Sequence, residues 1–236
     1  MPPFLSHLIQ FIQQPEVTHN ILSGLSVTVK ITALSTLLAA FVGVITVFIR
    51  TQLGHISLFS WLSRAYVSLF RNTPLLLHLY LFYRGLQSLG INLTEETCGV
   101  LALGLYTGAY VSEILRSGFL AIPRTQWDSG QALGMSAIQV FFWVTLPQAI
   151  RYCLPALGNQ SINLMKNSSL VAFITVEDLF FTVYRGAVND FRPVEYFIVG
   201  ASLYITLSLL IGAIVHGLDY CLERRWLRFP KLVGGI

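Results

Sequence analysis

The chain has 236 residues, of which 54% are hydrophobic and only 11% are charged, and its mean hydropathy is +0.66. This composition is too apolar for an ordinary soluble domain and indicates a protein that lies in a lipid bilayer. The net charge of +4 does not indicate nucleic-acid binding, because the basic residues lie beside apolar segments and cluster only near the carboxyl end.

Five apolar segments are candidates for membrane helices, since about 20 helical residues span roughly 30 Å of hydrocarbon. We predict an all-α membrane protein of a single domain (1–236), with five transmembrane helices at residues 21–49, 74–89, 98–115, 150–174 and 196–218. Before the second segment, apolar residues recur at helical spacing in a basic connector and predict an interfacial helix. Pro74 should interrupt any helix that continues from this connector.

Small residues in the third segment predict close packing against another helix. They are Gly99, Ala102, Gly104, Gly108 and Ala109.

The distribution of Lys and Arg predicts the orientation, because basic loops stay in the cytoplasm. The connectors after the first and third segments and the tail together carry ten of these residues, whereas the other loops carry three. We therefore expect an inner-membrane protein of the bacterial type, with its amino terminus outside and its carboxyl terminus in the cytoplasm.

The most informative stretch is QWDSGQALGMSAIQVFFWVTLPQAIR, residues 126–151, in the longest basic connector. It resembles the coupling loop of importer-type ABC permeases, which reads Glu-Ala-Ala, three residues, Gly, nine residues, then Ile, any residue, Leu-Pro. The places of that pattern are taken here by Asp128, Ser129, Gly130, Gly134, Val144, Leu146 and Pro147. The resemblance predicts a cytoplasmic coupling loop at about 120–148.

The chemistry of this stretch suits a docking element. We expect Asp128 in the first turn of a short helix, where an anion favours the helix dipole, and Gly134 at a reversal between two helices. Ala132, Leu133 and Met135 would then form an apolar knob that fills a groove on a partner protein. The alternative is an ordinary amphipathic connector.

Two further stretches resemble the polar amino acid permease family of ABC importers. RNTPLLLHLY (71–80) is similar to a family segment in which Arg71, Thr73 and Pro74 have a structural role, and LPALGNQSINLMKNSSL (154–170) is similar to the family's fourth-span signature. The resemblance implies a type I ABC importer permease fold. It also implies three kinds of partner: a cytoplasmic ABC ATPase dimer, a second permease that is identical or homologous, and an extracytoplasmic amino acid-binding protein.

ATP hydrolysis is not expected in this chain. No glycine precedes a lysine anywhere in the sequence, which excludes a phosphate-binding loop of the G-x-x-x-x-G-K-[ST] form. We therefore predict a transport subunit that is not an enzyme and has no cofactor or metal of its own, with ATP and Mg bound by the partner ATPase.

The fourth apolar segment carries polar residues that lipid would not accommodate. We predict that it lines the substrate pathway through Asn159, Gln160, Asn163, Lys166, Asn167 and Ser169. Amides and an ammonium group can bind a zwitterionic amino acid. Helix-to-helix hydrogen bonding between two permeases is an equal alternative.

Two other ionisable residues lie within apolar segments. Lys30, in the first, fits either a contact with a neighbouring span or a pathway role, and Glu113, in the third, should pair with Arg116 one helical turn away.

The expected substrates are polar amino acids. No acidic residue occurs between Asp128 and Glu177, so the fourth segment has nothing to balance a cationic side chain and acidic or amide amino acids are favoured. An ion-coupled secondary transporter is the first alternative, although such proteins commonly contain two repeated halves and none is visible here. A non-transport membrane anchor subunit is the second.

Overall fold

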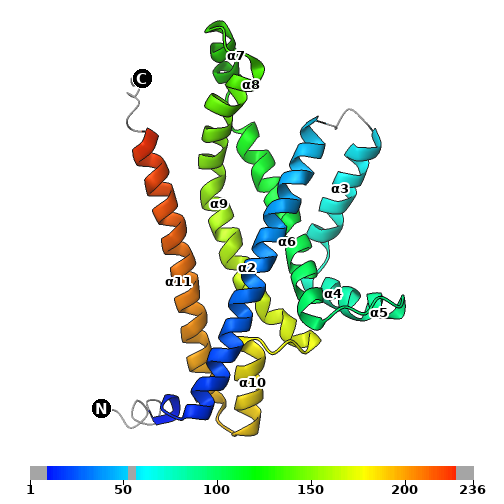
Figure 1. The fold of residues 1–236 in the computed structure, drawn as a ribbon, viewed down its shortest axis with the longest axis vertical. Helices are drawn as coiled ribbons and strands as arrows, with labels where there is room; N and C mark the ends of the chain where they lie inside the picture. The colour runs from blue at the N-terminus through cyan, green and yellow to red at the C-terminus, as the bar shows by residue number, and fades with distance from the viewer. Residues whose placement is uncertain (1–9, 53–56, 227–236) are drawn as a thin grey trace.

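The computed structural model describes residues 10–52 and 57–226, which are helical and contain no strand. Four long helices form its body: α2 (Pro15–Gln52), α6 (Glu95–Leu120), α9 (Leu146–Asn167) and α11 (Pro193–Trp226). They lie along the long direction of the molecule (Figure 1). Each belongs to a segment that is long and apolar enough to cross a membrane, as an all-α membrane fold requires.

The second predicted span, residues 74–89, consists of short helical pieces and is not among the described segments that are long and apolar enough to cross a membrane, whereas the connector helix predicted before it is present. α3 (Ser57–Asn72) returns from the end of α2, and α4 (Leu75–Tyr80) begins after Pro74. A π-helical turn (Leu81–Gly85) then leads into α5 (Leu86–Ser88). Because proline has no N–H and clashes with the preceding turn, the chain bends there, and α4 and α5 lie across the long direction (Figure 1).

Close packing between α2 and α6 depends on glycines. A Cβ atom at Gly104 would lie 2.6 Å from Leu38, and one at Gly43 would lie 2.5 Å from Val111. The small residues predicted to form a packing face are all buried: Gly99, Ala102, Gly104, Gly108 and Ala109. The prediction that this face packs on another helix is confirmed.

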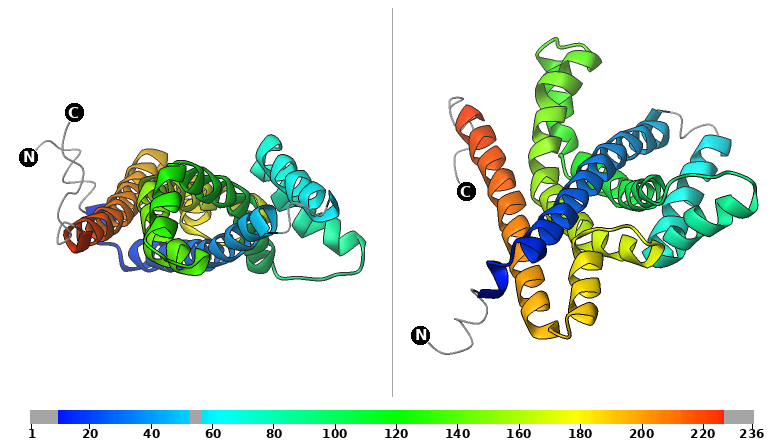
Figure 2. Two further views of the ribbon diagram at one scale, coloured as in Figure 1. Left: turned by 90° about the horizontal axis from the view of Figure 1, so that it is seen from above. Right: turned by 60° about the horizontal axis from the view of Figure 1, so that its bottom comes forward.

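The remaining helices pack around this pair. α9 meets α6 where a Cβ at Gly118 would lie 2.1 Å from the Sγ of Cys153, and α11 meets α9 where a Cβ at Gly158 would lie 2.5 Å from Val215. A 3-10 segment (Ser168–Ile174) connects α9 to α10 (Leu179–Asn189), which packs on α2 and α11. Figure 2 shows α10 at the end of the molecule opposite the α6–α9 connection.

The α6–α9 connection consists of α7 (Arg124–Ala132), α8 (Ala137–Val140) and a π-helical turn (Phe141–Thr145). It projects beyond the neighbouring helix ends at the top of Figure 1. The carboxyl ends of α2 and α11 and the start of α3 lie toward the same side (Figure 1). The α6–α9 connection and the end of α2, which belong to the basic connectors, therefore lie toward one end of the molecule, whereas α3 runs back from that end toward α4.

Candidate functional site

α7 ends in a turn whose geometry requires glycine at position 134. Gly134 has a φ of +79°, in the left-handed region that disfavours other residues. Its N–H donates to the Gln131 carbonyl at 2.9 Å, and the Met135 N–H donates to the Gly130 carbonyl at 3.1 Å. These two bonds form a Schellman motif, which satisfies the last carbonyls of α7. The chain turns at Gly134, as the sequence predicts.

α8 begins directly after this turn with a capping box. The Ser136 hydroxyl accepts from the Gln139 N–H at 3.3 Å, while the Gln139 side chain accepts from the Ser136 N–H at 2.8 Å. Gly130 packs closely on α8, since a Cβ there would lie 2.7 Å from the buried Val140. α7, α8 and the residues between them (133–136) thus form a unit stabilised by its own backbone. We call this whole unit the α7–α8 turn.

The α7–α8 turn presents apolar side chains to its surroundings. Leu133 is 82% exposed, Ala132 is exposed and Met135 is half-buried. Ile138, at 71% exposure, extends this surface from α8 and was not among the residues predicted from the sequence. Because residues 140–144 are apolar as well, nothing in the local sequence distinguished Ile138 as an exposed position.

Asp128 does not lie where the sequence suggested. α7 begins at Arg124, after Pro123, so Asp128 and Ser129 are in its middle and exposed rather than in its first turn. The expected interaction of Asp128 with the helix dipole is therefore wrong. Leu146 and Pro147 are half-buried at the start of α9, where the π-helical turn before them accommodates the missing proline N–H.

The polar residues of the fourth span divide into two groups on α9. Asn159, Asn163 and Lys166, spaced four and three residues apart, are exposed on one helix face. Gln160, Asn167 and Ser169 are half-buried. The structure therefore places only part of the predicted set on the exposed face of α9.

Gln160 lines a cavity of about 260 Å³ between α2, α6 and α9. Its polar lining also includes Thr36, Thr107 and Ser161, and the remaining lining is apolar. Asn159 lines a separate groove of about 250 Å³ against α11, together with His216 and Asp219. Asp219 thus places an acidic side chain near the predicted pathway residues. The prediction considered only residues 128–177 and so did not include it.

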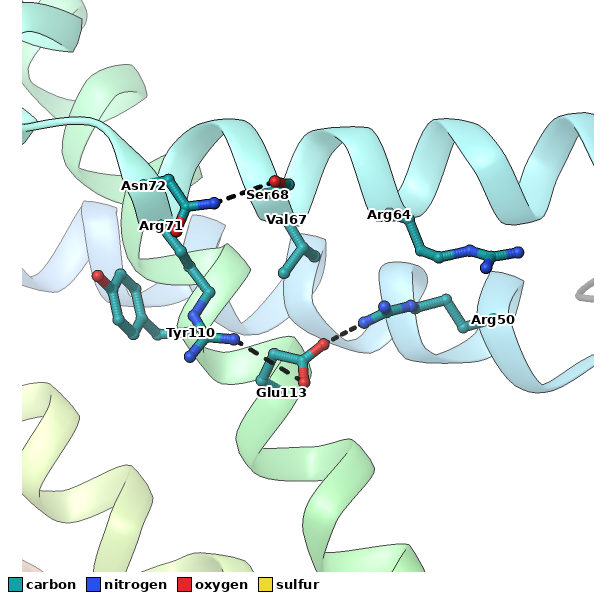
Figure 3. A pocket seen from close by; sticks show the side chains of 8 residues that line it. All are labelled: Arg50, Arg64, Val67, Ser68, Arg71, Asn72, Tyr110 and Glu113. Atoms are coloured by element: carbon teal, nitrogen blue, oxygen red, sulfur yellow. Dashed lines mark hydrogen bonds and ion pairs between the residues drawn. The ribbon is translucent and has the colours of Figure 1, made fainter.

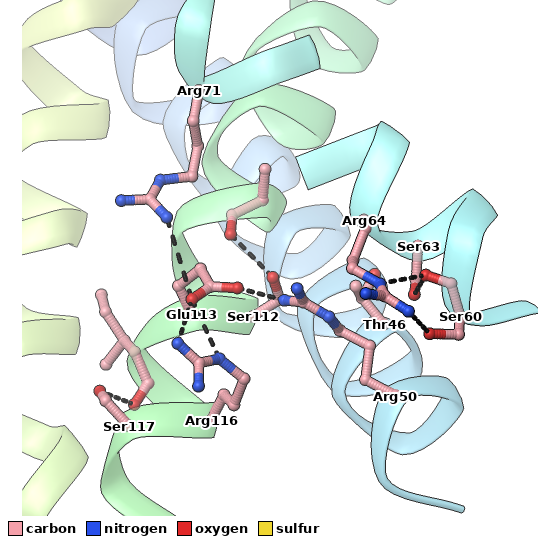
Figure 4. Close-up of polar contacts among 12 residues, drawn as sticks. Thr46, Arg50, Ser60, Ser63, Arg64, Arg71, Ser112, Glu113, Arg116 and Ser117 are labelled. Carbon is pink, nitrogen blue, oxygen red and sulfur yellow. Dashed lines mark hydrogen bonds and ion pairs between the residues drawn. The ribbon is translucent and has the colours of Figure 1, made fainter. Parts of the chain in front are cut away.

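The two ionisable residues singled out in the first and third spans both have partners. The Nζ atom of Lys30 lies 2.6 Å from a carboxylate oxygen of Glu96, and both side chains are partly exposed. Glu113 forms the predicted pair with Arg116, at 2.7 Å. It also contacts Arg50 and lies 3.9 Å from Arg71, so three arginines surround one carboxylate (Figure 4).

Arg71 and Thr73, predicted to be structural, are engaged at the break before Pro74. The Thr73 hydroxyl donates to the Leu69 carbonyl at 2.5 Å and lies 3.0 Å from the Nε2 atom of His78. Arg71 reaches Glu113 and stacks over Tyr110, with its guanidinium carbon 5.3 Å from the ring centroid. The Arg71 contacts hold the end of α3 against α6, and the Thr73 contacts join α3 to α4.

The family of binding-protein-dependent transport system inner membrane components matches residues 36–228. The chain belongs to this family. Membership makes it a permease subunit rather than an enzyme, with ATP hydrolysis in a separate subunit, and implies ATPase, binding-protein and second-permease partners. Its place is in a membrane that it crosses several times, consistent with a bacterial inner membrane.

Characterised relatives are amino acid permeases. The chain is 33% identical over 202 residues to the L-cystine transport system permease protein of Bacillus subtilis, covering 85% of this chain and 86% of the relative. It is 33% identical over 184 residues to the arginine ABC transporter permease protein of Escherichia coli K12, covering 68% and 77%. The octopine transport system permease protein of Rhizobium meliloti is 31% identical, with 89% of both chains covered. This permease is therefore a subunit of an amino acid ABC importer.

Solved structures agree with this assignment. A crystal structure of an amino acid ABC transporter with histidines has a TM-score of 0.81 and 31% identity, covering 89% of this chain and 97% of that chain. An inward-facing MetNI methionine ABC transporter has a TM-score of 0.73 at 17% identity, covering 89% and 99%, and supports the fold. The type I importer permease fold is thus confirmed.

Proposed function

We propose that this permease imports acidic or amide amino acids by alternating access, and that the α7–α8 turn receives the motion of the ATPase. The observation that supports coupling most directly is the exposed apolar surface of Ala132, Leu133 and Ile138 on a unit that projects from the body. An apolar surface of this kind stabilises a complex when a partner groove covers it.

The polar face of α9 supports a substrate pathway. Asn159, Asn163 and Lys166 are exposed within an apolar membrane segment, and such residues face a cavity or a partner rather than lipid. The Lys166 ammonium group could bind a substrate carboxylate while amides bind its other polar groups. An interface with the second permease is the alternative use of the same face.

The orientation follows from the basic end of the molecule. The end of α2, which carries Arg50 in its last turn, the start of α3 and the α7–α8 turn lie toward one end (Figure 1), which we assign to the cytoplasm because basic loops stay there. The ATPase would then dock on the α7–α8 turn, and the binding protein would dock near α10.

Transport in proteoliposomes tests the proposed function. The complex of this chain with its ATPase, supplied with binding protein and labelled amino acid, should accumulate substrate when ATP is enclosed on the ATPase side. An ionophore should leave the initial rate unchanged. Uptake that requires an ion gradient and ignores ATP would instead support the secondary transporter.

The substrate assignment rests on Lys166, and Lys166→Ala should lower glutamate, aspartate and glutamine uptake at least about tenfold, since a hydrogen bond to a charged group contributes roughly 1.5–3 kcal/mol. Lys166→Arg keeps the charge and should retain most uptake. Arginine uptake by the same variants is the comparison, because the negative charge of Asp219, in the groove beside Asn159, is opposite to that of Lys166 and suits a cationic substrate. Unchanged glutamate, aspartate and glutamine uptake in Lys166→Ala would make the site assignment wrong.

A further inference from the structure

A second polar cavity lies between α2, α3 and α6, away from the α9 face. Its volume is about 420 Å³, the size of roughly a dozen water molecules. The lining contains a single apolar side chain, that of Val67. The polar lining, drawn in Figure 3, consists of Arg50, Arg64, Ser68, Arg71, Asn72, Tyr110 and Glu113. We call it the basic cavity.

The charges of the basic cavity do not balance. Among the residues that the structure describes, Glu113 is the one acidic residue that lines it, against three arginines. Its carboxylate, with a side chain only 17% exposed, already contacts Arg50, Arg71 and Arg116. One carboxylate cannot neutralise this number of guanidinium groups, so the cavity keeps an excess of positive charge.

Arg64 lines the basic cavity but is not among the arginines that contact Glu113. Its Nε atom donates to the Ser60 carbonyl at 3.1 Å, and its guanidinium also contacts the Ser60 hydroxyl, both within α3. These are neutral acceptors. Among the described residues these hydrogen bonds of Arg64 stay within α3, so Arg64 is not needed to hold Glu113 (Figure 4).

The side chains around this excess charge are suited to an oxyanion. Each guanidinium has five N–H donors, of which the Glu113 contacts use only some. The Asn72 amide and Ser68 hydroxyl, which lie 3.0 Å apart, add neutral polar groups on the α3 side. One planar guanidinium group can donate two parallel hydrogen bonds to two oxygens of a phosphate.

We propose that the basic cavity binds a phosphate group, supplied by an anionic phospholipid headgroup or by free phosphate. The lipid source relies on the orientation proposed above, which puts the cavity on the cytoplasmic side, where basic pockets between membrane helices bind anionic headgroups. A bound phosphate group would connect α2, α3 and α6.

Native mass spectrometry of the complete permease–ATPase complex, with phosphatidylglycerol or phosphatidylcholine added in mild detergent, tests the lipid source. Phosphatidylglycerol should be retained in preference to phosphatidylcholine. Arg64→Gln should lower that retention about fivefold, the effect of one arginine near an anionic surface, because it removes a charge without breaking the Glu113 contacts. Arg84→Gln removes an arginine that stacks on Tyr83, outside the cavity, and should leave retention unchanged.

Inorganic phosphate alone tests the other source. If free phosphate is the ligand, millimolar phosphate should raise the unfolding temperature of the lipid-depleted complex, and Arg64→Gln but not Arg84→Gln should abolish this rise. Chloride at equal ionic strength is the control. Two results together would overturn the proposal. The first is equal retention of both lipids, or equal effects of Arg64→Gln and Arg84→Gln on retention. The second is that phosphate gives no response, or a response that does not depend on Arg64. Because neither readout measures transport, failure here is distinct from failure of the import function.

Discussion

The α7–α8 turn and the contacts around Glu113 are stabilised in different ways. The turn depends on backbone hydrogen bonds between residues at most five positions apart and on one left-handed glycine. The Glu113 contacts connect three helices, and Arg50 is 63 positions away. A structure held by local hydrogen bonds, such as the α7–α8 turn, can be recognised from a sequence motif. A contact between distant segments depends on how the helices pack.

The substitution with the largest expected effect on uptake is Gly134→Val, which disrupts the α7–α8 turn. A β-branched residue at a φ of +79° is strained, and the left-handed conformation costs roughly 1–2 kcal/mol for an ordinary residue. A Cβ there meets no neighbour within 4 Å, so the strain lies in the backbone. We expect normal membrane levels, loss of the ATPase on gentle purification and uptake reduced to background.

Gly134→Asn is the matched control for this substitution. Asparagine tolerates the left-handed region, so the turn should form and uptake should remain near that of the unmodified protein. Equal activity of the Val and Asn variants would contradict the role of backbone geometry.

The contacts between helices should be tested with Glu113→Gln. Removing this carboxylate leaves three arginines without their common partner, of which Arg71 and Arg116 are 42% and 41% exposed. Because a hydrogen bond to a charged group contributes roughly 1.5–3 kcal/mol, we expect a loss of stability in this range. Denaturant unfolding of the purified complex measures the loss.

Glu96→Gln provides the comparison, because its pair with Lys30 is partly exposed and such pairs contribute about 1 kcal/mol or less. Equal losses in the two variants would remove the distinction between the Glu113 contacts and an ordinary surface pair.

Asp178 combines local and distant contacts in one residue. Its carboxylate accepts from the Phe181 N–H at 2.9 Å, which caps α10, and from the Tyr204 hydroxyl of α11 at 3.3 Å. Burial raises its pKa to about 6 from 3.8, despite these hydrogen bonds. The folded state therefore binds a proton more tightly than the unfolded state, and this group destabilises the fold progressively as pH rises from about 4 to 6.

Asp178→Asn keeps a capping side chain and removes the titration. Its free energy of unfolding, relative to that of the unmodified protein, should increase between pH 4 and pH 6 by at most about 3 kcal/mol and stay level above. Circular dichroism unfolding at several pH values measures it. A difference that is constant with pH, or that decreases, would contradict the assigned pKa.

The sequence predicted the elements whose signal is local. The register of Gly134 against Leu146 and Pro147 indicated the coupling loop, and the small residues of α6 indicated its packing face. Asp128 was misplaced because Pro123, rather than the motif, determines where α7 begins. Dipole arguments therefore need the helix start, which the motif alone does not provide.

Features that depend on packing were not predicted. The sequence identified Arg116 as the partner of Glu113 but not Arg50 or Arg71, which belong to other helices. The interruption at Pro74 was predicted, but the directions of α3 and α4 on either side of it were not, because they depend on contacts with α6. Asp219 approaches Asn159 for the same reason.

Cysteine cross-linking at Leu133 tests the coupling claim most directly. In a Cys221→Ser background the remaining native cysteines, Cys98 and Cys153, are buried, so Leu133→Cys offers the reactive thiol. A short thiol-to-amine reagent in membranes should join it to the ATPase. Leu89→Cys, a matched control 76% exposed at the end of α5, should give no such product. An ATPase adduct at Leu89 but none at Leu133 would contradict both the coupling role and the orientation.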